Sequence, residues 1–296
     1  MSISFKILVG FFFVSLSSFS QTVATHTYAV KQNDSLKLDV YTPGNIQPNQ
    51  KLPVLIWMHG GGFSGGLRDG KDEKQLMKYI TTKGYIGVSI SYRLLRKGAK
   101  TGFGCKCSKE EKLFTFAMAA QDLLDATIFM ITQSDSLQID TKKIIAGGSS
   151  AGAEAVLSAV YMKDYFIEDT SAYDQIQYAG IISLAGAMVD ETHITTANAI
   201  PTVLFHGTKD NLVPYSKAPH HFCNKEDTGF LMLTGSGVIF TRLEKLNTSC
   251  YLFRVEGGEH EVASIPFAEM DHIMTFINNT VIDSKVIQTK RLEFKK

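Results

Sequence analysis

Two short runs near the N-terminus alternate apolar and polar residues, and longer apolar runs follow them along the chain. Residues 26–30 and 36–41 carry the alternation, and a polar turn joins them. This pattern predicts an antiparallel hairpin. Residues 53–58 are continuously apolar, which is typical of a strand that is covered on both of its faces.

After this strand, apolar runs of strand length alternate with segments of helical spacing. The expected strands cover residues 86–92, 143–147, 179–184, 202–206 and 251–255. The expected helices cover residues 76–83, 113–132, 151–162, 238–246 and 266–280. Such an alternation predicts an α/β fold: a mostly parallel twisted sheet with helices on both faces, preceded by the antiparallel hairpin.

No linker and no internal repeat interrupts this pattern, so residues 21–284 are expected to form one domain. The highly charged residues 285–296 are expected to be a solvated C-terminal tail. Residues 95–108 and 214–237 fit neither strand nor helix. Irregular segments of this length are often functional, and we expect them to shape the mouth of a site.

Composition and charge narrow the class of protein. Of the 296 residues, 44% are hydrophobic and 20% are charged, which excludes a disordered, collagen-like or coiled-coil chain. The formal net charge is +1. A chain so close to neutrality has no long-range field to hold a polyanion, so nucleic acid is not expected as a partner. The sequence does not indicate an oligomeric state.

The N-terminal segment has the features of an export signal. Lys6 precedes the apolar run Ile7–Leu16, and Ser18 and Ser20 are small residues at the third and first positions before the expected cut. This order predicts a signal peptide over residues 1–20, cleaved before Gln21, and a secreted or periplasmic protein. The alternatives are an uncleaved anchor helix and a buried strand. No other stretch is expected to supply the roughly 20 apolar residues of a membrane span.

The four cysteines, Cys105, Cys107, Cys223 and Cys250, would remain in an exported chain, where disulfides are permitted. They allow three pairings, and the sequence does not choose among them. Cys105 and Cys107 are too close for an easy mutual bond, so at least one should reach a distant loop. Free buried thiols are the alternative, and zinc is disfavoured because no further ligands complete a set of four.

The most informative motif lies between the strand at 143–147 and the helix at 151–162. Gly148-Ser-Ser-Ala-Gly152 fits the pattern G-x-S-x-G in one frame, with Ser150 at its centre. A nucleophilic serine needs a sharp strained turn, and small residues on either side allow strand and helix to approach each other. The N–H of Ala151 lies at the N-terminus of the expected helix, where partial positive charge favours an oxyanion. A glycine-rich packing turn without catalysis is the alternative.

A second glycine-rich segment, His59-Gly-Gly-Gly-Phe63, follows the strand at 53–58. Its N–H groups are unobstructed, so Gly61 and Gly62 are the expected oxyanion donors together with Ala151. A phosphate-binding loop is disfavoured, because neither glycine-rich phosphate motif opens a helix here. We interpret His59 as a structural residue that fixes the loop by hydrogen bonding.

A serine nucleophile requires a base and an acid that orients the base. His260 follows the strand at 251–255 in a glycine-rich loop, and Asp210 follows the strand at 202–206. Loops at the carboxyl ends of parallel strands carry the functional residues of open α/β sheets. The order Ser150, Asp210, His260 is the one expected for this type of triad. His206, within a strand, is expected to be a satisfied core histidine. The remaining alternatives for acid or base are Asp190, His193 and Glu259.

Taken together, these motifs resemble the α/β-hydrolases of the carboxylesterase and hormone-sensitive-lipase-like group. The residues that carry the resemblance are His59–Phe63, Ser91-Tyr-Arg-Leu94, Gly148–Ala153, His206–Asp210 and Gly257–His260. The resemblance implies the triad roles above, and a structural Arg93 paired with a helix carboxylate such as Asp122. The group's motif often continues from Tyr-Arg-Leu into Ala-Pro. Here Leu95-Arg96 leads instead into the Cys105/Cys107 loop, so we expect a differently shaped entrance.

The resemblance implies a serine esterase that hydrolyses carboxylic esters through an acyl-enzyme, with no cofactor and no metal. Small-molecule esters are the implied substrates, and aromatic and polysaccharide-linked esters lie within the group's range. The alternatives are a prolyl-oligopeptidase-like serine peptidase of the same fold and a non-catalytic binding protein of that fold. The sequence does not identify the acyl group or the alcohol.

Overall fold

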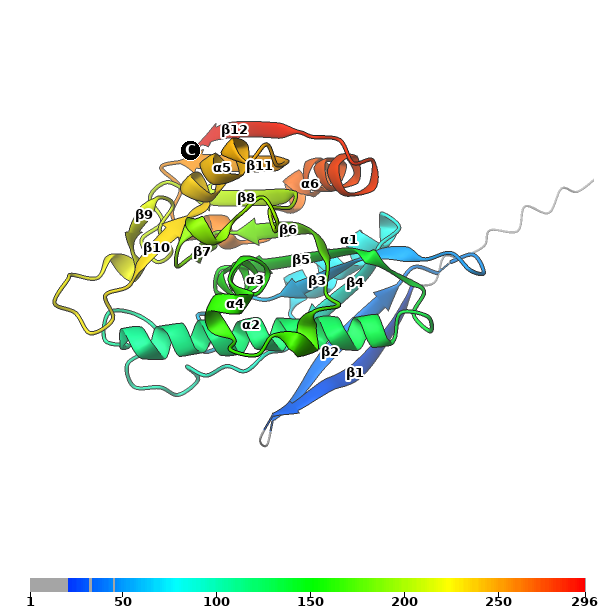
Figure 1. The fold of residues 1–296 in the computed structure, drawn as a ribbon, viewed down its shortest axis with the longest axis horizontal. Helices are drawn as coiled ribbons and strands as arrows, with labels where there is room; N and C mark the ends of the chain where they lie inside the picture. Colours follow the sequence, from blue (N-terminus) through cyan, green and yellow to red (C-terminus); the bar gives the residue numbers. More distant parts are fainter. Residues whose placement is uncertain (1–20, 32–33, 45, 296) are drawn as a thin grey trace, which may run out of the picture.

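The computed structural model describes residues 21–31, 34–44 and 46–295. Its main sheet has nine strands in the order β1-β2-β4-β3-β5-β6-β8-β11-β12 (Figure 1). These strands are β1 (Thr22–Lys31), β2 (Asp34–Thr42), β3 (Leu52–Met58), β4 (Ile86–Ile90), β5 (Ile139–Ser149), β6 (Tyr178–Leu184), β8 (Thr202–Gly207), β11 (Cys250–Glu256) and β12 (Gln288–Phe294). The pairs β1–β2 and β2–β4 are antiparallel, and the other pairs are parallel. The structure confirms the predicted hairpin and the mostly parallel sheet. The expected signal peptide lies outside the described residues.

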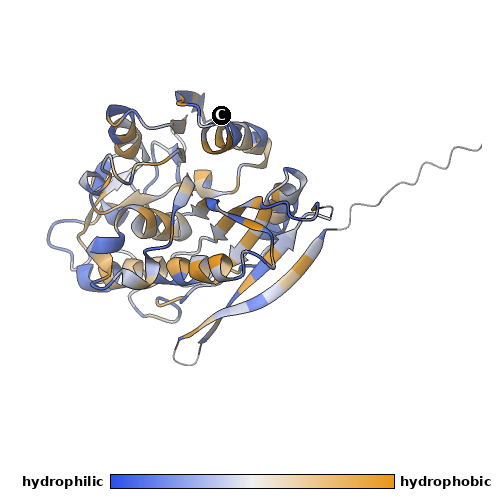
Figure 2. Ribbon diagram, turned by 45° about the vertical axis from the view of Figure 1, so that its right-hand side comes forward, coloured by the Kyte–Doolittle hydropathy of each residue, from blue (hydrophilic) through white to orange (hydrophobic). Residues whose placement is uncertain are grey.

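Helices cover both faces of this sheet. They are α1 (Lys71–Thr82), α2 (Lys109–Thr132), α3 (Ala151–Tyr161), α4 (Lys163–Phe166), α5 (Ser236–Lys245) and α6 (Met270–Ile277). Successive side chains of a strand point to opposite faces. Thus Ile56 of β3 joins the core shared with α2, α3 and α5, whereas Trp57 joins the core shared with α1 and α6. Figure 2 shows the hydrophobic colouring concentrated in the central strands and on the helices beside them.

α2 is a long helix of 24 residues that is largely apolar. It begins earlier than expected because Ser108 and Glu111 form a reciprocal capping box at its N-terminus. By length and composition alone it is long and apolar enough to cross a membrane, which differs from our expectation that no stretch after the N-terminus would approach that range. However, 61% of its most apolar window is buried inside the domain, as in a core helix.

The predicted pairing of Arg93 with Asp122 is confirmed. Arg93 Nη2 lies 2.7 Å from Asp122 Oδ1, and Asp122 also accepts the backbone N–H of Arg93 at 2.8 Å. Asp122 is fully buried on α2. Burial raises the pKa of its carboxyl, and the hydrogen bonds from Arg93 oppose that shift. The pair therefore fixes the segment after β4 against α2.

Residues 285–296 differ from the expected solvated tail. Residues 288–294 form β12, which pairs in parallel with β11 at the edge of the main sheet. All seven side chains of β12 are exposed, so it has no apolar face by which a sequence pattern reveals a strand. Its backbone hydrogen bonds nevertheless extend the domain beyond residue 284.

The segment 214–237, expected to be irregular, contributes to a second, smaller sheet. β10 (Met232–Gly235) pairs antiparallel with both β9 (Lys217–Pro219) and β7 (Ala187–Met188). Strands of two to four residues are too short to show an alternation, which explains why the sequence did not predict them.

Candidate active site

The turn between β5 and α3 holds Ser150 in a strained conformation. Its φ of 51° and ψ of −122° are rare for a residue with a side chain. The flanking glycines make this turn possible: a methyl group at Gly152 would lie 2.2 Å from the carbonyl oxygen of Met58, and one at Gly148 would lie 2.5 Å from the backbone of Gly152. The G-x-S-x-G pattern thus follows from a close approach of α3 to the sheet.

The structure brings the three predicted side chains into one hydrogen-bonded chain. Ser150 Oγ lies 2.8 Å from His260 Nε2, and His260 Nδ1 lies 2.7 Å from Asp210 Oδ2. A carboxylate only accepts hydrogen bonds, so Nδ1 carries the proton and Nε2 is left to accept from the serine hydroxyl. Ser149 is not available in the same way, because its Oγ donates to the carbonyl of Ala263 at 2.7 Å.

Close packing of two loops places Asp210 beside His260. The N–H of Lys209 donates to the carbonyl of Gly258 at 2.7 Å, and a methyl group at Gly207 would lie 2.3 Å from that same oxygen. The loops after β8 and β11 therefore meet at the carboxyl edge of the sheet. Residues separated by fifty positions come together because their strands are neighbours.

Asp210 is buried and held from several sides. Its Oδ1 accepts the N–H groups of Leu212 and Val213, each at 2.9 Å. Burial by itself raises the pKa of this carboxyl, but hydrogen bonds and charge from His206 and His260 outweigh it and hold the pKa well below its usual range. Asp210 is thus a carboxylate fixed in position.

His206 is a neighbour of Asp210 whose contact with the acid the sequence analysis missed. Its Nδ1 lies 2.8 Å from Ser236 Oγ, and its Nε2 lies 3.0 Å from the carbonyl of Val213 and 3.4 Å from Asp210 Oδ2. It is the satisfied core histidine that we expected. The signal that could have revealed the contact is its position four residues before the acid.

The glycine-rich loop after β3 lies against the serine turn. Gly60, Gly61 and Gly62 line the same pocket as Ser150 and Ala151. Within the described residues, no backbone partner accepts the N–H groups of Gly61, Gly62 or Ala151. Gly61 and Gly62 both have positive φ angles, 121° and 59°, which residues other than glycine rarely adopt.

His59 fixes this loop, as predicted. Its Nδ1 lies 2.7 Å from the carbonyl of Gly60, and its own carbonyl accepts the hydroxyl of Tyr92 at 2.9 Å. Burial lowers the pKa of the His59 imidazole, although the hydrogen bond to Gly60 opposes this, and the ring therefore favours its neutral form.

The remaining alternatives for acid and base lie elsewhere. Asp190 caps the short turn at 191–193 by accepting the N–H of Thr192, and His193 packs against the ring of Tyr165. Glu259 is exposed, with its carboxylate 3.8 Å from Lys295 Nζ. In the described residues, none of the three is hydrogen-bonded to Ser150 or His260.

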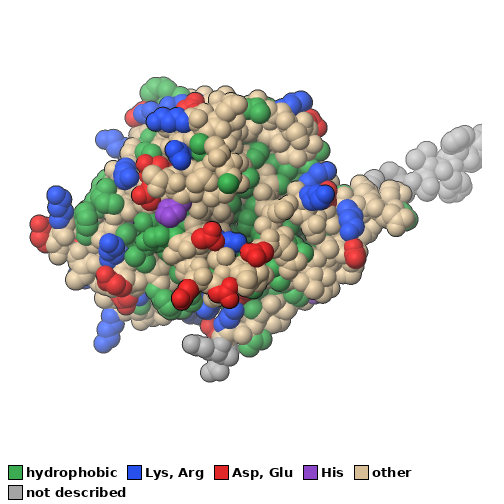
Figure 3. Space-filling view, in the orientation of Figure 1, with side chains coloured by type: hydrophobic (Ala, Val, Ile, Leu, Met, Phe, Trp, Pro, Cys, Tyr) green, Lys and Arg blue, Asp and Glu red, His purple; other side chains and the backbone are tan. Residues whose placement is uncertain are grey.

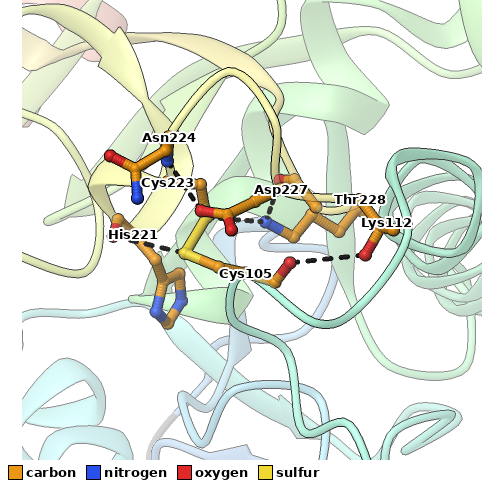
Figure 4. Close-up of a disulfide and its surroundings, with 8 residues drawn as sticks. Cys105, Lys112, His221, Cys223, Asn224, Asp227 and Thr228 are labelled. Carbon is orange, nitrogen blue, oxygen red and sulfur yellow. Dashed lines mark hydrogen bonds between the residues drawn. A yellow bond between two sulfur atoms is a disulfide. The ribbon is translucent and has the colours of Figure 1, made fainter.

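The two irregular segments form a wall of the pocket, as we expected. Phe103 comes from the first segment, and His220 and His221 come from the second. A disulfide between Cys105 and Cys223 joins the segments (Figure 4). Cys107 and Cys250 are free and buried. The expectation that Cys105 or Cys107 reaches a distant loop is thereby confirmed. The pocket has a volume of about 420 Å³.

Removal of this disulfide should lower stability substantially. It closes a loop of 118 residues, so in the chain-entropy account it contributes about 5 kcal/mol by restricting the unfolded chain. We expect the double substitution Cys105→Ser and Cys223→Ser to lower the free energy of unfolding by roughly that amount, measured by urea denaturation.

A reductant provides the matched control for this prediction. It should lower the stability of the unaltered protein toward that of the double variant and leave the variant unchanged. Equal stability of the two oxidised proteins would contradict the prediction.

Comparison with known proteins identifies the class. The structure is similar to that of a thermophilic esterase from Thermogutta terrifontis, with a TM-score of 0.64 at 16% sequence identity. The match covers 90% of this chain and 93% of the esterase chain. It therefore has the α/β-hydrolase fold. Residues 38–195, more than half of the chain, match the BD-FAE family model, and the chain belongs to the BD-FAE family. Ser150 lies within this matched range, and Asp210 and His260 lie beyond it.

The curated relatives match only in part. Mouse carboxylesterase 1F is 39% identical over 61 residues, which is 21% of this chain and 10% of that protein. A secreted triacylglycerol lipase from Gibberella zeae is 27% identical over 163 residues, which is 53% of this chain and 26% of the lipase. The match thus spans 10% of the length of the carboxylesterase and 26% of the length of the lipase.

Proposed function

We propose that this protein is a serine hydrolase of carboxylic esters. The observation that carries the proposal is the hydrogen-bonded chain from Ser150 Oγ through His260 to Asp210, at 2.8 Å and 2.7 Å. Membership of the BD-FAE family and partial similarity to carboxylesterases and a lipase support the same conclusion. Small-molecule esters are the proposed substrates.

In this proposal Ser150 attacks the ester carbonyl while His260 Nε2 accepts its proton. The imidazolium that forms is stabilised by the Asp210 carboxylate, and His260 then passes the proton to the leaving alcohol. An acyl-enzyme remains on Ser150. Water, deprotonated by His260, releases the acid and restores the serine.

The negative charge on the carbonyl oxygen is proposed to be held by the N–H groups of Gly61, Gly62 and Ala151. These groups line the pocket beside Ser150, and Ala151 opens α3, where the helix dipole adds partial positive charge. Loss of one such donor typically reduces turnover by about 10²–10³-fold. Neither a metal nor an organic cofactor has a step in this reaction.

Covalent labelling tests the proposal directly. A fluorophosphonate probe is expected to label the unaltered protein at Ser150, and p-nitrophenyl acetate is expected to be hydrolysed. A non-catalytic binding protein would remain unlabelled, and a peptidase would also hydrolyse aminoacyl amides, which an esterase leaves intact. Either outcome would overturn the proposal.

We also propose that the protein is exported. Disulfides persist in oxidising compartments, and Cys105 and Cys223 form one here. The Gibberella zeae relative is described as secreted. N-terminal sequencing of the protein from its native cells should begin at Gln21. An intact Met1 on a cytoplasmic protein with free thiols at 105 and 223 would contradict this.

A further inference from the structure

The wall of the pocket contains two buried polar side chains that the reaction above does not use. Glu154 lies on α3 one turn after Ser150, and His220 lies in the segment between β9 and β10. Only 2% of Glu154 and 1% of His220 is exposed, and both line the pocket. Glu154 Oε1 lies 3.5 Å from His220 Nε2.

Neither side chain is satisfied within the protein. Among the residues that the structure describes, Glu154 Oε1 and His220 Nδ1 have no hydrogen-bond partner. A buried polar atom without a partner destabilises the folded state, so such atoms normally find a partner in protein, water or ligand. Because both side chains line the pocket, a molecule that fills the pocket would lie beside them.

The surroundings of the pair favour an uncharged ligand. Burial and the nearby Asp210 carboxylate raise the pKa of Glu154 well above its usual value, although Lys112 opposes this. Burial, and then His221 and Lys112, lower the pKa of His220 well below its usual value, although Asp210 opposes this. Lys112 itself is engaged, because its Nζ donates to the carbonyl of Gly229 at 2.6 Å. A neutral carboxyl and a neutral imidazole together offer both donors and acceptors.

Apolar side chains lie beside this polar pair in the pocket wall. Leu212 and Val213 line the pocket, and the ring of Phe103 packs edge-on against that of His220, with centroids 5.2 Å apart. Along α3, four residues correspond to a rise of about 6 Å, so Glu154 lies roughly that far along the helix from Ser150. A ligand that reaches both must carry its polar group several bonds from the ester carbonyl.

We propose that Glu154 and His220 form a recognition site for an uncharged hydroxyl group on the part of the ester that fills this pocket. This inference rests on the proposed ester hydrolysis, and it narrows the substrate class to hydroxylated esters. The hydroxyl donates to one member of the pair and accepts from the other, which satisfies atoms that are otherwise unpaired.

Matched esters that differ by one hydroxyl test this inference in the unaltered protein. The acyl arm compares p-nitrophenyl 3-hydroxybutyrate with the butyrate, and the 6-hydroxyhexanoate with the hexanoate. The alcohol arm compares 2-hydroxyethyl butyrate with ethyl butyrate. We expect kcat/KM to be at least tenfold higher for the hydroxylated ester in one of these pairs.

Substitutions at Glu154 assign the preference to this site. Glu154→Met removes both polar atoms at similar volume and should abolish the preference, whereas Glu154→Gln keeps a donor and an acceptor and should retain most of it. Ser158→Ala, at a buried α3 position outside the pocket, is the matched control and should keep the preference. The ratio of kcat/KM for the two esters of a pair is compared between each variant and the unaltered protein, which cancels any effect of the hydroxyl on intrinsic reactivity.

The outcomes separate this inference from the proposed function. Equal kcat/KM values in every pair would overturn the inference alone, as would a preference that Glu154→Met retains. A preference for p-nitrophenyl 6-aminohexanoate over the 6-hydroxyhexanoate would overturn the inference that the recognised group is uncharged. If no ester is hydrolysed and the fluorophosphonate probe does not label Ser150, the proposed function and the inference fall together.

Discussion

Replacement of Ser150 by alanine is expected to lower kcat for p-nitrophenyl acetate by at least about 10⁵-fold. No neighbouring hydroxyl replaces it, because Ser149 Oγ donates to the carbonyl of Ala263 and faces a different partner. Alanine keeps the Cβ atom, so the strained φ of 51° is unchanged and stability should hardly alter. Kinetics and thermal denaturation of the same preparation measure both effects.

The control for this experiment is Ser158→Ala, which removes a hydroxyl from the same helix outside the pocket. It should retain labelling by the fluorophosphonate probe and full hydrolysis. Turnover of Ser150→Ala near that of the unaltered protein would assign the reaction to another nucleophile. Unfolding of the variant would leave its kinetics uninterpretable, so labelling of the unaltered protein at residue 150 serves as the second measurement.

Long periodic segments allowed most of the main sheet to be predicted from the sequence. The central strands β3, β4 and β5 are covered on both faces, and their apolar runs have few other interpretations. The serine turn could also be predicted from the sequence, because the approach of α3 to β3 leaves no space for a side chain at Gly152 and so requires glycine there. In these cases one local constraint determines both the residue type and the backbone.

Features that depend on partners distant in the sequence could not be derived in this way. The sequence leaves the pairing of the four cysteines open, and only the positions of the two loops select the Cys105–Cys223 bond. β12 is held by backbone hydrogen bonds that leave no pattern in its exposed side chains. Glu154 was overlooked within an apolar helix, although a single acid in such a helix is a signal of a buried polar site.

Asp210→Asn is expected to reduce kcat by about 10⁴-fold while esters still bind. An asparagine amide can donate to His260 Nδ1, which would move the imidazole proton to Nε2 and leave no acceptor for the Ser150 hydroxyl. The two N–H groups that hold Oδ1, from Leu212 and Val213, would still find an acceptor in a correctly oriented amide. Steady-state kinetics should therefore show a large loss in kcat and a small change in KM.

The matched control is Asp190→Asn, since Asp190 was the competing acid and lies outside the hydrogen-bonded chain of Ser150. It should change kcat by less than about threefold, because in the described residues its contact is a helix-capping bond to Thr192. A loss equal to that of Asp210→Asn would transfer the role of acid to Asp190. Nearly full activity of Asp210→Asn would remove Asp210 from the reaction.

The dependence of stability on pH provides a second test of Asp210. Since its pKa is lower in the folded protein than the value of about 3.9 expected in the unfolded chain, its ionisation stabilises the fold above pH 4. That contribution declines as the pH falls from about 4 toward the lower pKa of the folded protein. The difference in free energy of unfolding between the unaltered protein and Asp210→Asn should therefore be largest near pH 7 and smaller at pH 3. Urea denaturation at the two pH values measures it, and a difference that grows toward pH 3 would contradict the lowered pKa, because an acid destabilised as its carboxylate would gain from protonation.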